Sequence, residues 1–135
     1  MLELKHIQTT RIVARPADLD AATWPQDAIV MRVARDEVLA IANVGREIVS
    51  DPYAIVESDE GFAAVWISAA EAQSFLERTC EWELPHNRPA FAQGAVANLP
   101  LKLWFEQDRV LFVVPGPYAV DLQEYLRGAI KSLFQ

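Results

Sequence analysis

The stretch Phe62–Leu84 reads FAAVWIS AAEAQSFLERTC EWEL and joins a strand pattern to a helix pattern. Its first part, Phe62–Ile67, is too short for a helix and is rich in Val, Ile and aromatic residues, which favours a β-strand. Ser68 and Glu71 have the spacing of a capping box. In that motif the Ser side chain accepts from the backbone N–H of the Glu, and the Glu side chain reaches back to the N–H of the Ser. The sequence therefore predicts a strand that leads directly into a capped helix, AAEAQSFLERTC.

The chain before this stretch is expected to contain a strand, a loop and a hairpin. Leu2–Ala14 has short apolar alternations, which favour an edge strand or an extended arm. Arg15–Asp27 carries two prolines and three aspartates around Trp24, and we expect it to be irregular. Two β-prone runs joined by the polar turn Ala34–Asp36 predict a hairpin over Ala28–Ala42.

A second hairpin is predicted immediately before the capped helix. Its strands would be Tyr53–Glu57 and Phe62–Ile67, and its turn would be the polar run Ser58–Gly61. Upstream of it, REIVS in the segment Asn43–Asp51 is compatible with a further short strand.

After the capped helix the chain returns to strands and then ends in a second helix. Pro85–Pro89 has proline at both ends and a polar middle, which predicts a loop. The strand-like runs that follow are Ala95–Asn98, Leu101–Phe105 and Val110–Val114. A stripe of leucines after Gly116 and Pro117 predicts the closing helix.

This order of elements indicates an α+β fold, because the helices are segregated from largely hairpin-connected strands. We expect an antiparallel or mixed sheet with helices packed on one side. The first topology to consider is a split β-α-β arrangement of the ferredoxin-like kind. The length of 135 residues predicts a single domain over residues 1–135, with 1–27 as an N-terminal arm and loop and 28–135 as its core.

Composition and charge restrict the function. The formal charge of −7 argues against a nucleic-acid footprint and against an anionic membrane surface. No apolar run reaches the roughly 20 residues of a spanning helix, and the first residues lack the apolar segment of a secretory signal. With one cysteine the chain can form no internal disulfide. A cytoplasmic location is the expectation.

No catalytic, cofactor-binding or metal-ligating motif is visible. His6 and His86 are far apart in the sequence, and the lone Cys80 has no CxxC partner, so we predict no metal site. Cys80 with His86 could form a thiol–imidazole pair, although a small buried side chain near a helix end is the simpler interpretation. The serines lack a nucleophile-elbow motif and the glycines lack a phosphate-binding pattern. Neighbouring carboxylates do occur, in predicted turns or loops: Asp18 with Asp20, Asp36 with Glu37, and Asp59 with Glu60.

The four tryptophans are the remaining unusual feature of so short a chain. Large aromatic side chains make good interface anchors when they are not internal. Trp104 lies on the side of its strand opposite to Leu101, Leu103 and Phe105, which makes it the first candidate for a partner contact. Trp24 is the second candidate, and the alternative for both is packing over the core of the protein.

Four segments have an order, spacing and pattern that are typical of one family. They are MRVARDEVLAI (31–41), VESDEGFAAVWISAAEAQSFLERTCEWEL (56–84), RPAFAQGAVANLPLKLWFEQDRVLFVV (88–114) and PGPYAVDLQEYLRGA (115–129). Together they resemble the gamma subunit of heterotetrameric sarcosine oxidase, over roughly Ala28–Ala129. The resemblance implies a fold similar to the folate-binding domain of aminomethyltransferases.

The resemblance also implies a function. The gamma chain is a small accessory subunit, and flavin, NAD and folate chemistry belongs to the larger subunits. We therefore expect a non-catalytic accessory subunit that binds no cofactor by itself and acts through contacts with larger oxidase-type subunits. A homo-oligomer is the other partner expectation, since an exposed sheet edge could pair with a second copy. The alternative function is a stand-alone folate-type binding module, in which Asp59 or Glu60 would meet a pterin ring.

Overall fold

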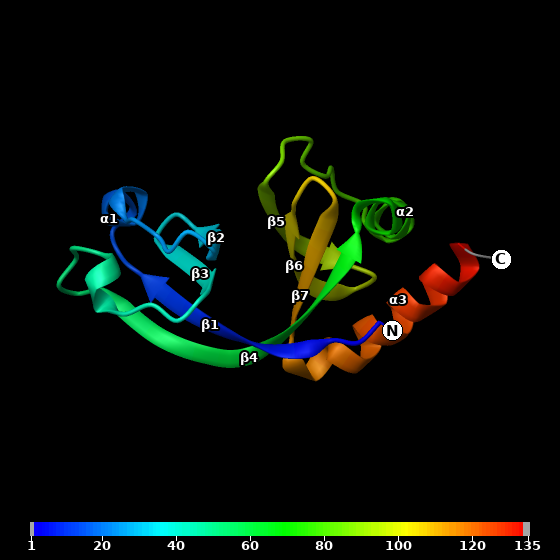
Figure 1. The fold of residues 1–135 in the computed structure, drawn as a ribbon, viewed down its shortest axis with the longest axis horizontal. Helices are drawn as coiled ribbons and strands as arrows, with labels where there is room; N and C mark the ends of the chain where they lie inside the picture. Colours follow the sequence, from blue (N-terminus) through cyan, green and yellow to red (C-terminus); the bar gives the residue numbers. More distant parts are fainter. Residues whose placement is uncertain (1, 134–135) are drawn as a thin grey trace. The chain divides into compact units, whose positions relative to one another are not determined.

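The computed structural model describes residues 2–133, and the chain forms two compact units (Figure 1). We call Ile7–Glu60 the N-terminal unit, and Gly61 onward together with the first six residues the C-terminal unit. Two strands, β1 (Lys5–Val13) and β4 (Ile55–Ser68), each contribute residues to both units. The pairs β1–β3, β2–β3, β4–β7, β6–β7 and β5–β6 are all antiparallel. The α+β class with a mostly antiparallel sheet is therefore confirmed.

The N-terminal unit contains a sheet in the order β2-β3-β1-β4 and one short α-helix. The predicted hairpin over Ala28–Ala42 is confirmed, and it consists of β2 (Ile29–Ala34) and β3 (Glu37–Ile41). Leu19 of the helix α1 (Pro16–Ala21) packs into the core of this unit. The buried apolar residues of that core are Ile12, Ala14, Leu19, Val38, Ala40, Val49 and Ala54.

Three expectations for the N-terminal unit were wrong. The strand β1 lies between β3 and β4 and is not an edge strand. The segment Arg15–Asp27 was expected to be irregular but contains α1, in which proline occupies the first turn, where no intrahelical N–H bond is lost. The run REIVS contains the 3₁₀ helix η1 (Arg46–Ile48) in place of a short strand.

The second predicted hairpin is also wrong, because β4 runs through the predicted turn without interruption. Ser58–Gly61 has turn-like composition, yet these residues are extended and mostly exposed. The hydroxyl of Thr9 on β1 donates to the carbonyl of Asp59 at 2.5 Å, which ties this part of β4 to its neighbour. Asp59 and Glu60, expected in a loop, are therefore strand residues. Pairing with a strand distant in sequence overrides the local turn preference.

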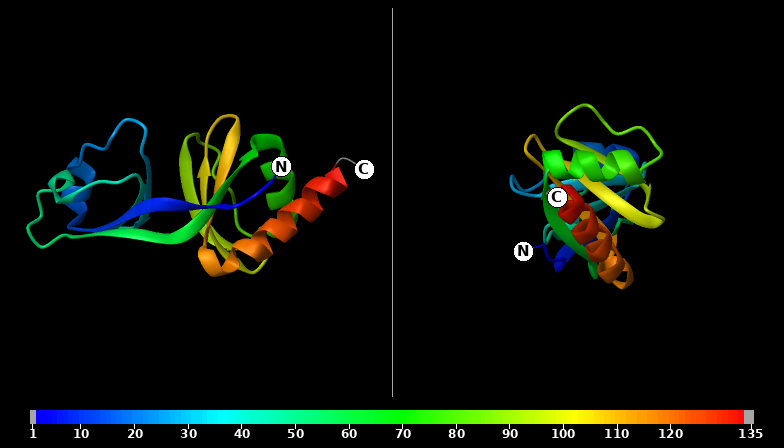
Figure 2. Two further views of the ribbon diagram at one scale, coloured as in Figure 1. Left: turned by 60° about the horizontal axis from the view of Figure 1, so that its bottom comes forward. Right: turned by 90° about the vertical axis from the view of Figure 1, so that its right-hand side faces the viewer.

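The C-terminal unit contains a sheet in the order β4-β7-β6-β5 and two helices (Figure 2). Its further elements are α2 (Ala69–Thr79), β5 (Ala90–Val96), β6 (Leu99–Phe105), β7 (Arg109–Pro115), the 3₁₀ helix η2 (Gly116–Tyr118) and α3 (Ala119–Leu133). Residues of α2 and α3 join the same buried cluster as alternate residues of β6 and β7. Both helices therefore pack on one face of this sheet, as the sequence predicts.

The split β-α-β topology is not confirmed. In that arrangement the two strands joined by a helix are parallel, with one strand between them. The strands joined by α2 are β4 and β5, and two strands, β7 and β6, separate them. Because each neighbouring pair is antiparallel, β4 and β5 run in opposite directions.

The helix α2 begins at the predicted cap. The backbone N–H of Glu71 donates to the hydroxyl oxygen of Ser68 at 3.2 Å. The Glu71 carboxylate in turn accepts from the Ser68 hydroxyl at 2.8 Å, where the sequence had suggested the backbone N–H of Ser68. Three residues of this helix are buried, and they are Ala72, Phe75 and Leu76.

The cap gives a first testable prediction. Ser68→Ala removes the acceptor for the Glu71 N–H and is expected to lower the free energy of unfolding by about 1 kcal/mol. Urea denaturation followed by circular dichroism measures the change. Ser68→Asp keeps an acceptor at the cap and serves as the matched control, with stability close to wild type. Equal stability of the Ala variant and the wild type would contradict the role of the cap.

Candidate functional site

One face of the sheet in the C-terminal unit carries a row of large side chains. We call Trp66, Leu111, Trp104 and Phe91 the aromatic row. Trp66 lies opposite Leu111, Leu111 opposite Trp104, and Trp104 opposite Phe91, so the row crosses four strands in register. Leu111 is buried, and the three aromatic side chains are only partly buried.

Strand alternation places this row on the face opposite to the helices. Along β6, Leu101, Leu103 and Phe105 join the core cluster that contains residues of α2 and α3. Trp104 lies between Leu103 and Phe105, so its side chain points to the other face. This arrangement confirms the two-sided pattern predicted for the strand, including the wetter side that carries Trp104.

A small polar network holds the two tryptophans of the row. The carboxylate of Glu106 accepts from Trp104 Nε1 at 3.1 Å and from Arg109 Nε at 2.9 Å. The Arg109 guanidinium lies over the ring of Trp66, with its central carbon 3.6 Å from the ring centroid. These contacts restrain the orientations of both rings. They comprise a hydrogen bond from Trp104 to Glu106, an ion pair between Glu106 and Arg109, and a cation–π contact of Arg109 with Trp66.

This arrangement suits protein recognition better than catalysis. Interfaces are enriched in Trp, Phe and Arg, and the residues that carry most binding energy are drawn largely from Trp, Tyr and Arg. Restraint in the free protein lowers the entropy lost when a partner binds. The row can therefore offer a rigid apolar surface with one charged pair beside it.

The second predicted contact residue, Trp24, lies in the N-terminal unit. It is half-buried and packs against the core cluster of that unit. This is the fold-back arrangement that the sequence left open for a tryptophan in a proline-bounded segment. Its role toward a partner stays a prediction.

Trp82, which the sequence did not single out, packs against β5. Its Nε1 donates to the carbonyl of Ala95 at 2.9 Å. The indole also lies over Gly94, where an added Cβ would approach Trp82 Nε1 to 2.8 Å. Glycine is required here because the ring approaches the backbone closely, and the ring covers part of this sheet edge.

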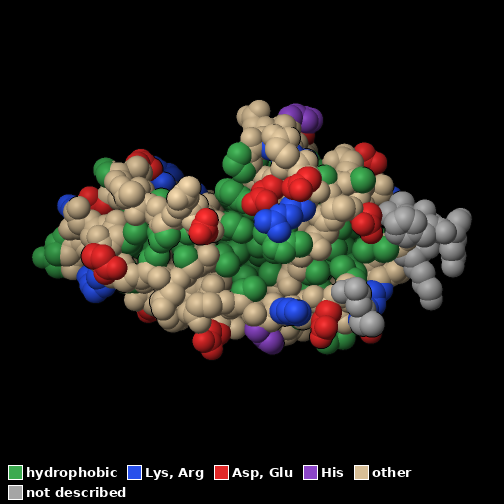
Figure 3. All heavy atoms as spheres, viewed as in Figure 1, with side chains coloured by type: hydrophobic (Ala, Val, Ile, Leu, Met, Phe, Trp, Pro, Cys, Tyr) green, Lys and Arg blue, Asp and Glu red, His purple; other side chains and the backbone are tan. Residues whose placement is uncertain are grey.

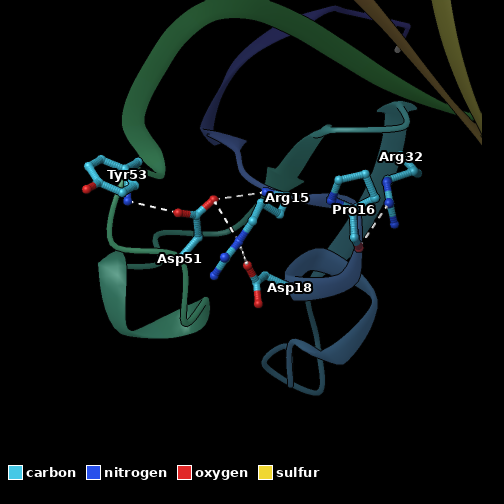
Figure 4. Close-up of polar contacts among 6 residues, drawn as sticks. All are labelled: Arg15, Pro16, Asp18, Arg32, Asp51 and Tyr53. Atoms are coloured by element: carbon cyan, nitrogen blue, oxygen red, sulfur yellow. Dashed lines mark hydrogen bonds and ion pairs between the residues drawn. The ribbon is translucent and has the colours of Figure 1, made fainter.

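The N-terminal unit contains a buried carboxylate that the sequence did not reveal, Asp51 (Figure 4). Its Oδ2 accepts from the backbone N–H of Arg15 at 3.0 Å and lies 3.7 Å from Arg15 Nε. Its Oδ1 accepts from the backbone N–H of Tyr53 at 2.9 Å. The same Arg15 Nε contacts Asp18 at 2.6 Å. Asp51 thereby joins the loop before β4 to the start of α1.

These contacts lower the pKa of Asp51 and raise the pKa of Arg15. The backbone N–H groups of Tyr53 and Arg15 hold the pKa of Asp51 below its usual range, against the effect of desolvation. Hydrogen bonding to Asp18 raises the pKa of Arg15, and the charges of Asp18 and Asp51 add to the effect. Ionised Asp51 thus stabilises the fold at neutral pH, and this contribution disappears as the pH falls below about 4 toward the lowered pKa.

The buried carboxylate gives a second testable prediction. Asp51→Asn is expected to lower the melting temperature by several degrees at pH 7, because the ionised acceptor of two N–H groups is lost. The difference from wild type should shrink as the pH falls below about 4 toward the lowered pKa of Asp51, because the wild type then loses its ionised carboxylate as well. Thermal denaturation at a series of pH values measures this. Asp27→Asn, at an exposed position, is the matched control. A difference that is constant with pH would refute the ionic role.

The other titratable pairs serve local structure. Asp18 contacts Arg15, Asp20 contacts Arg32 at 2.7 Å, and Glu37 contacts Arg11 at 3.2 Å. The thiol–imidazole pair that the sequence left open as the less favoured alternative is not observed between Cys80 and His86. The thiol of Cys80 lies 3.4 Å from the Trp82 carbonyl, whereas the largely exposed His86 lies 3.5 Å from Glu83. Among the described residues, no group of three His, Cys, Asp or Glu side chains could hold a metal ion.

An open depression of about 440 Å³ lies along the β5–β6 hairpin. Its lining includes Gly94, Leu99, Pro100 and Leu101, with Gln93, Asn98 and Lys102 as polar members. Asn98 and Ala97 adopt positive φ angles of 65° and 50°, which is the geometry of a tight two-residue hairpin turn. The lining lacks a carboxylate that could pair with a pterin ring, so this depression adds no specific support for folate binding.

The fold defines a mostly antiparallel α+β protein that carries a row of partly buried aromatic side chains on the sheet face opposite to its helices. In the described part of the chain, no helix is long and apolar enough to cross a membrane. No family model matches the chain, and no curated protein matches it by sequence.

A solved structure does match. The chain is similar to a chain of the heterotetrameric sarcosine oxidase from Corynebacterium sp. U-96, solved in complex with pyrrole 2-carboxylate. The TM-score is 0.76 at 14% sequence identity, and the match covers 98% of this chain and 84% of that chain. The resemblance to sarcosine oxidase expected from the sequence is thereby confirmed at the level of the fold.

Proposed function

We propose that this protein is a non-catalytic accessory subunit of an oxidase-type complex and acts through contacts with larger subunits. The observation that carries the proposal is the likeness over 98% of the chain to a chain of a heterotetrameric enzyme. A chain whose whole length adopts this fold is suited to the same kind of assembly.

The aromatic row supports the same function from the residues themselves. Trp104 and Trp66 are held in fixed orientations by Glu106 and Arg109 before any partner binds. In this proposal the row, and Trp104 in particular, contacts an apolar surface of a larger subunit. Flavin, NAD and folate would belong to the larger subunits, and the assembly would work in the cytoplasm.

The test is affinity purification of the tagged protein from its native organism, with mass spectrometry and a visible absorption spectrum of the eluate. Larger oxidase-type subunits and a flavin band in the eluate are expected. A colourless eluate that contains only this chain would contradict the proposal. In that case calorimetric titration with folates tests the alternative of a stand-alone binding module.

A further inference from the structure

An exposed apolar tip lies in the N-terminal unit between η1 and the start of β4. Tyr53 is 90% exposed, Ile55 is 44% exposed, and Pro52 is exposed as well. Figure 3 shows hydrophobic side chains on the surface at the left of the view, where Figure 1 places this loop. Single exposed apolar residues are normal. Here three fall within four positions, Pro52 and Tyr53 in the loop and Ile55 as the first residue of β4.

The backbone that carries Tyr53 is held by several hydrogen bonds. Asp51–Ala54 forms a turn in which the Ala54 N–H donates to the Asp51 carbonyl at 3.2 Å, with proline at the second position. The Asp51 carboxylate accepts from the Tyr53 N–H at 2.9 Å. The Arg46 guanidinium donates to the carbonyls of Ala54 at 2.7 Å and Pro52 at 3.2 Å. The buried Ala54 anchors the turn to the core.

These contacts fix the main chain of the turn while its largest side chain remains in water. Figure 4 shows the ring of Tyr53 pointing away from the Asp51 side chain that holds its N–H. A tyrosine has only two side-chain torsions, so little entropy is lost when such a residue is buried by a partner. Tyrosine is enriched among the residues that carry binding energy, and a turn fixed before binding lowers the entropy cost of burying it.

We propose that Tyr53 is a second partner contact of this protein, inserted into an apolar pocket with a basic rim on the larger subunit. The proposal rests on the proposed accessory function and adds to it a contact in the N-terminal unit. Tyr53 would supply the buried ring, and Ile55 and Pro52 would pack around the mouth of the pocket.

The N-terminal unit has a negative net charge, which favours a basic partner surface. Ile7–Glu60 contains ten acidic residues and five arginines, without lysine or histidine. Four of the arginines already contact this unit's own carboxylates or carbonyls: Arg11, Arg15, Arg32 and Arg46. The unit as a whole has more carboxylates than arginines, so Lys or Arg around the partner's pocket would be electrostatically complementary to it.

The test uses the oxidase-type subunits that the wild-type protein captures from its native organism. These subunits are immobilised after release from the complex, and the affinities of wild type and variants are measured by biolayer interferometry. Tyr53→Ala is expected to weaken binding about tenfold, and Tyr53→Phe to keep most of the affinity because the ring is retained. Tyr118→Ala, which removes another exposed tyrosine at 41% exposure, is the matched control and should bind as wild type.

Salt dependence tests the basic rim separately. The wild-type association rate should fall as ionic strength rises, because complementary charges steer the encounter. An association rate that is independent of salt would overturn the charged part of the proposal.

The remaining outcomes separate this inference from the proposed function. If the wild type captures subunits and Tyr53→Ala binds them as tightly, the Tyr53 contact is wrong while the accessory function stands. If the wild type captures no oxidase-type subunit, the accessory function and the Tyr53 contact both fail. The thermal midpoint of Tyr53→Ala, measured in parallel, should equal that of the wild type because the side chain is 90% exposed.

Discussion

Trp104→Ala is expected to weaken binding of the larger subunits about 30- to 100-fold, the largest functional loss from any single side chain of this protein. Trp104 is at an interior position of the aromatic row, opposite both Leu111 and Phe91. Its removal deletes one of the two tryptophan rings of the row and leaves the Glu106 carboxylate without one of its two donors. Tryptophan in a position of this kind typically supplies a large share of the binding energy of an interface.

The affinity of purified variants for the immobilised subunits measures this effect. Trp104→Phe keeps an aromatic ring without the N–H donor and should lose less affinity than the alanine variant. Val120→Ala removes a side chain that is 68% exposed elsewhere in the same unit, and it is the matched control. Wild-type affinity for Trp104→Ala, with the fold verified by circular dichroism, would exclude the aromatic row from the interface.

Phe112→Ala is expected to lower the free energy of unfolding by about 3–5 kcal/mol. Phe112 is fully buried in β7, opposite Val65 on β4 and Leu103 on β6. Its ring centroid lies 6.0 Å from that of Phe75 on α2, so it links the sheet to the helix. Alanine would leave a cavity between layers that can close only partly. A loss of this size is a large part of the stability of an ordinary domain.

Urea denaturation monitored by tryptophan fluorescence and by far-ultraviolet circular dichroism measures this change. Phe91→Ala is the matched control, because it removes the same side chain from a half-buried position on the other face of the sheet. The control should lose clearly less stability than Phe112→Ala. A loss below about 1 kcal/mol for Phe112→Ala would show that the layer between α2 and the sheet contributes little.

Local sequence patterns were sufficient where one element decides its own structure. Ser68 and Glu71 predicted the start of α2 correctly, because a cap is formed by residues three positions apart. The alternation along Leu101–Phe105 predicted which side of β6 faces the core and which side carries Trp104. The hairpin over Ala28–Ala42 was also found, since neighbouring β-prone runs with a short turn pair with each other.

Local patterns failed where distant residues decide the structure. The run Ser58–Gly61 reads as a turn, yet pairing with β1, including the contact from Thr9, keeps it extended. The strand order that rules out a split β-α-β arrangement depends on β7 pairing with β4, and no local signal specifies that partner. The sequence does not indicate that Asp51 is buried. Its carboxylate accepts from the N–H groups of Arg15 and Tyr53, and the contact with Arg15 forms only when the chain is folded.

By itself, the sequence determined the α+β class, the capped helix, the two-sided strand around Trp104 and the acidic charge. Each depends on composition or on residues a few positions apart, where backbone geometry is short-ranged. Only the tertiary structure decided that Trp66, Leu111, Trp104 and Phe91 form one row and that Arg109 and Glu106 restrain it. It also showed that Tyr53 stands exposed on a turn held by Arg46 and Asp51. These arrangements depend on strand register and on side-chain contacts, which bring together residues separated by many positions in the chain.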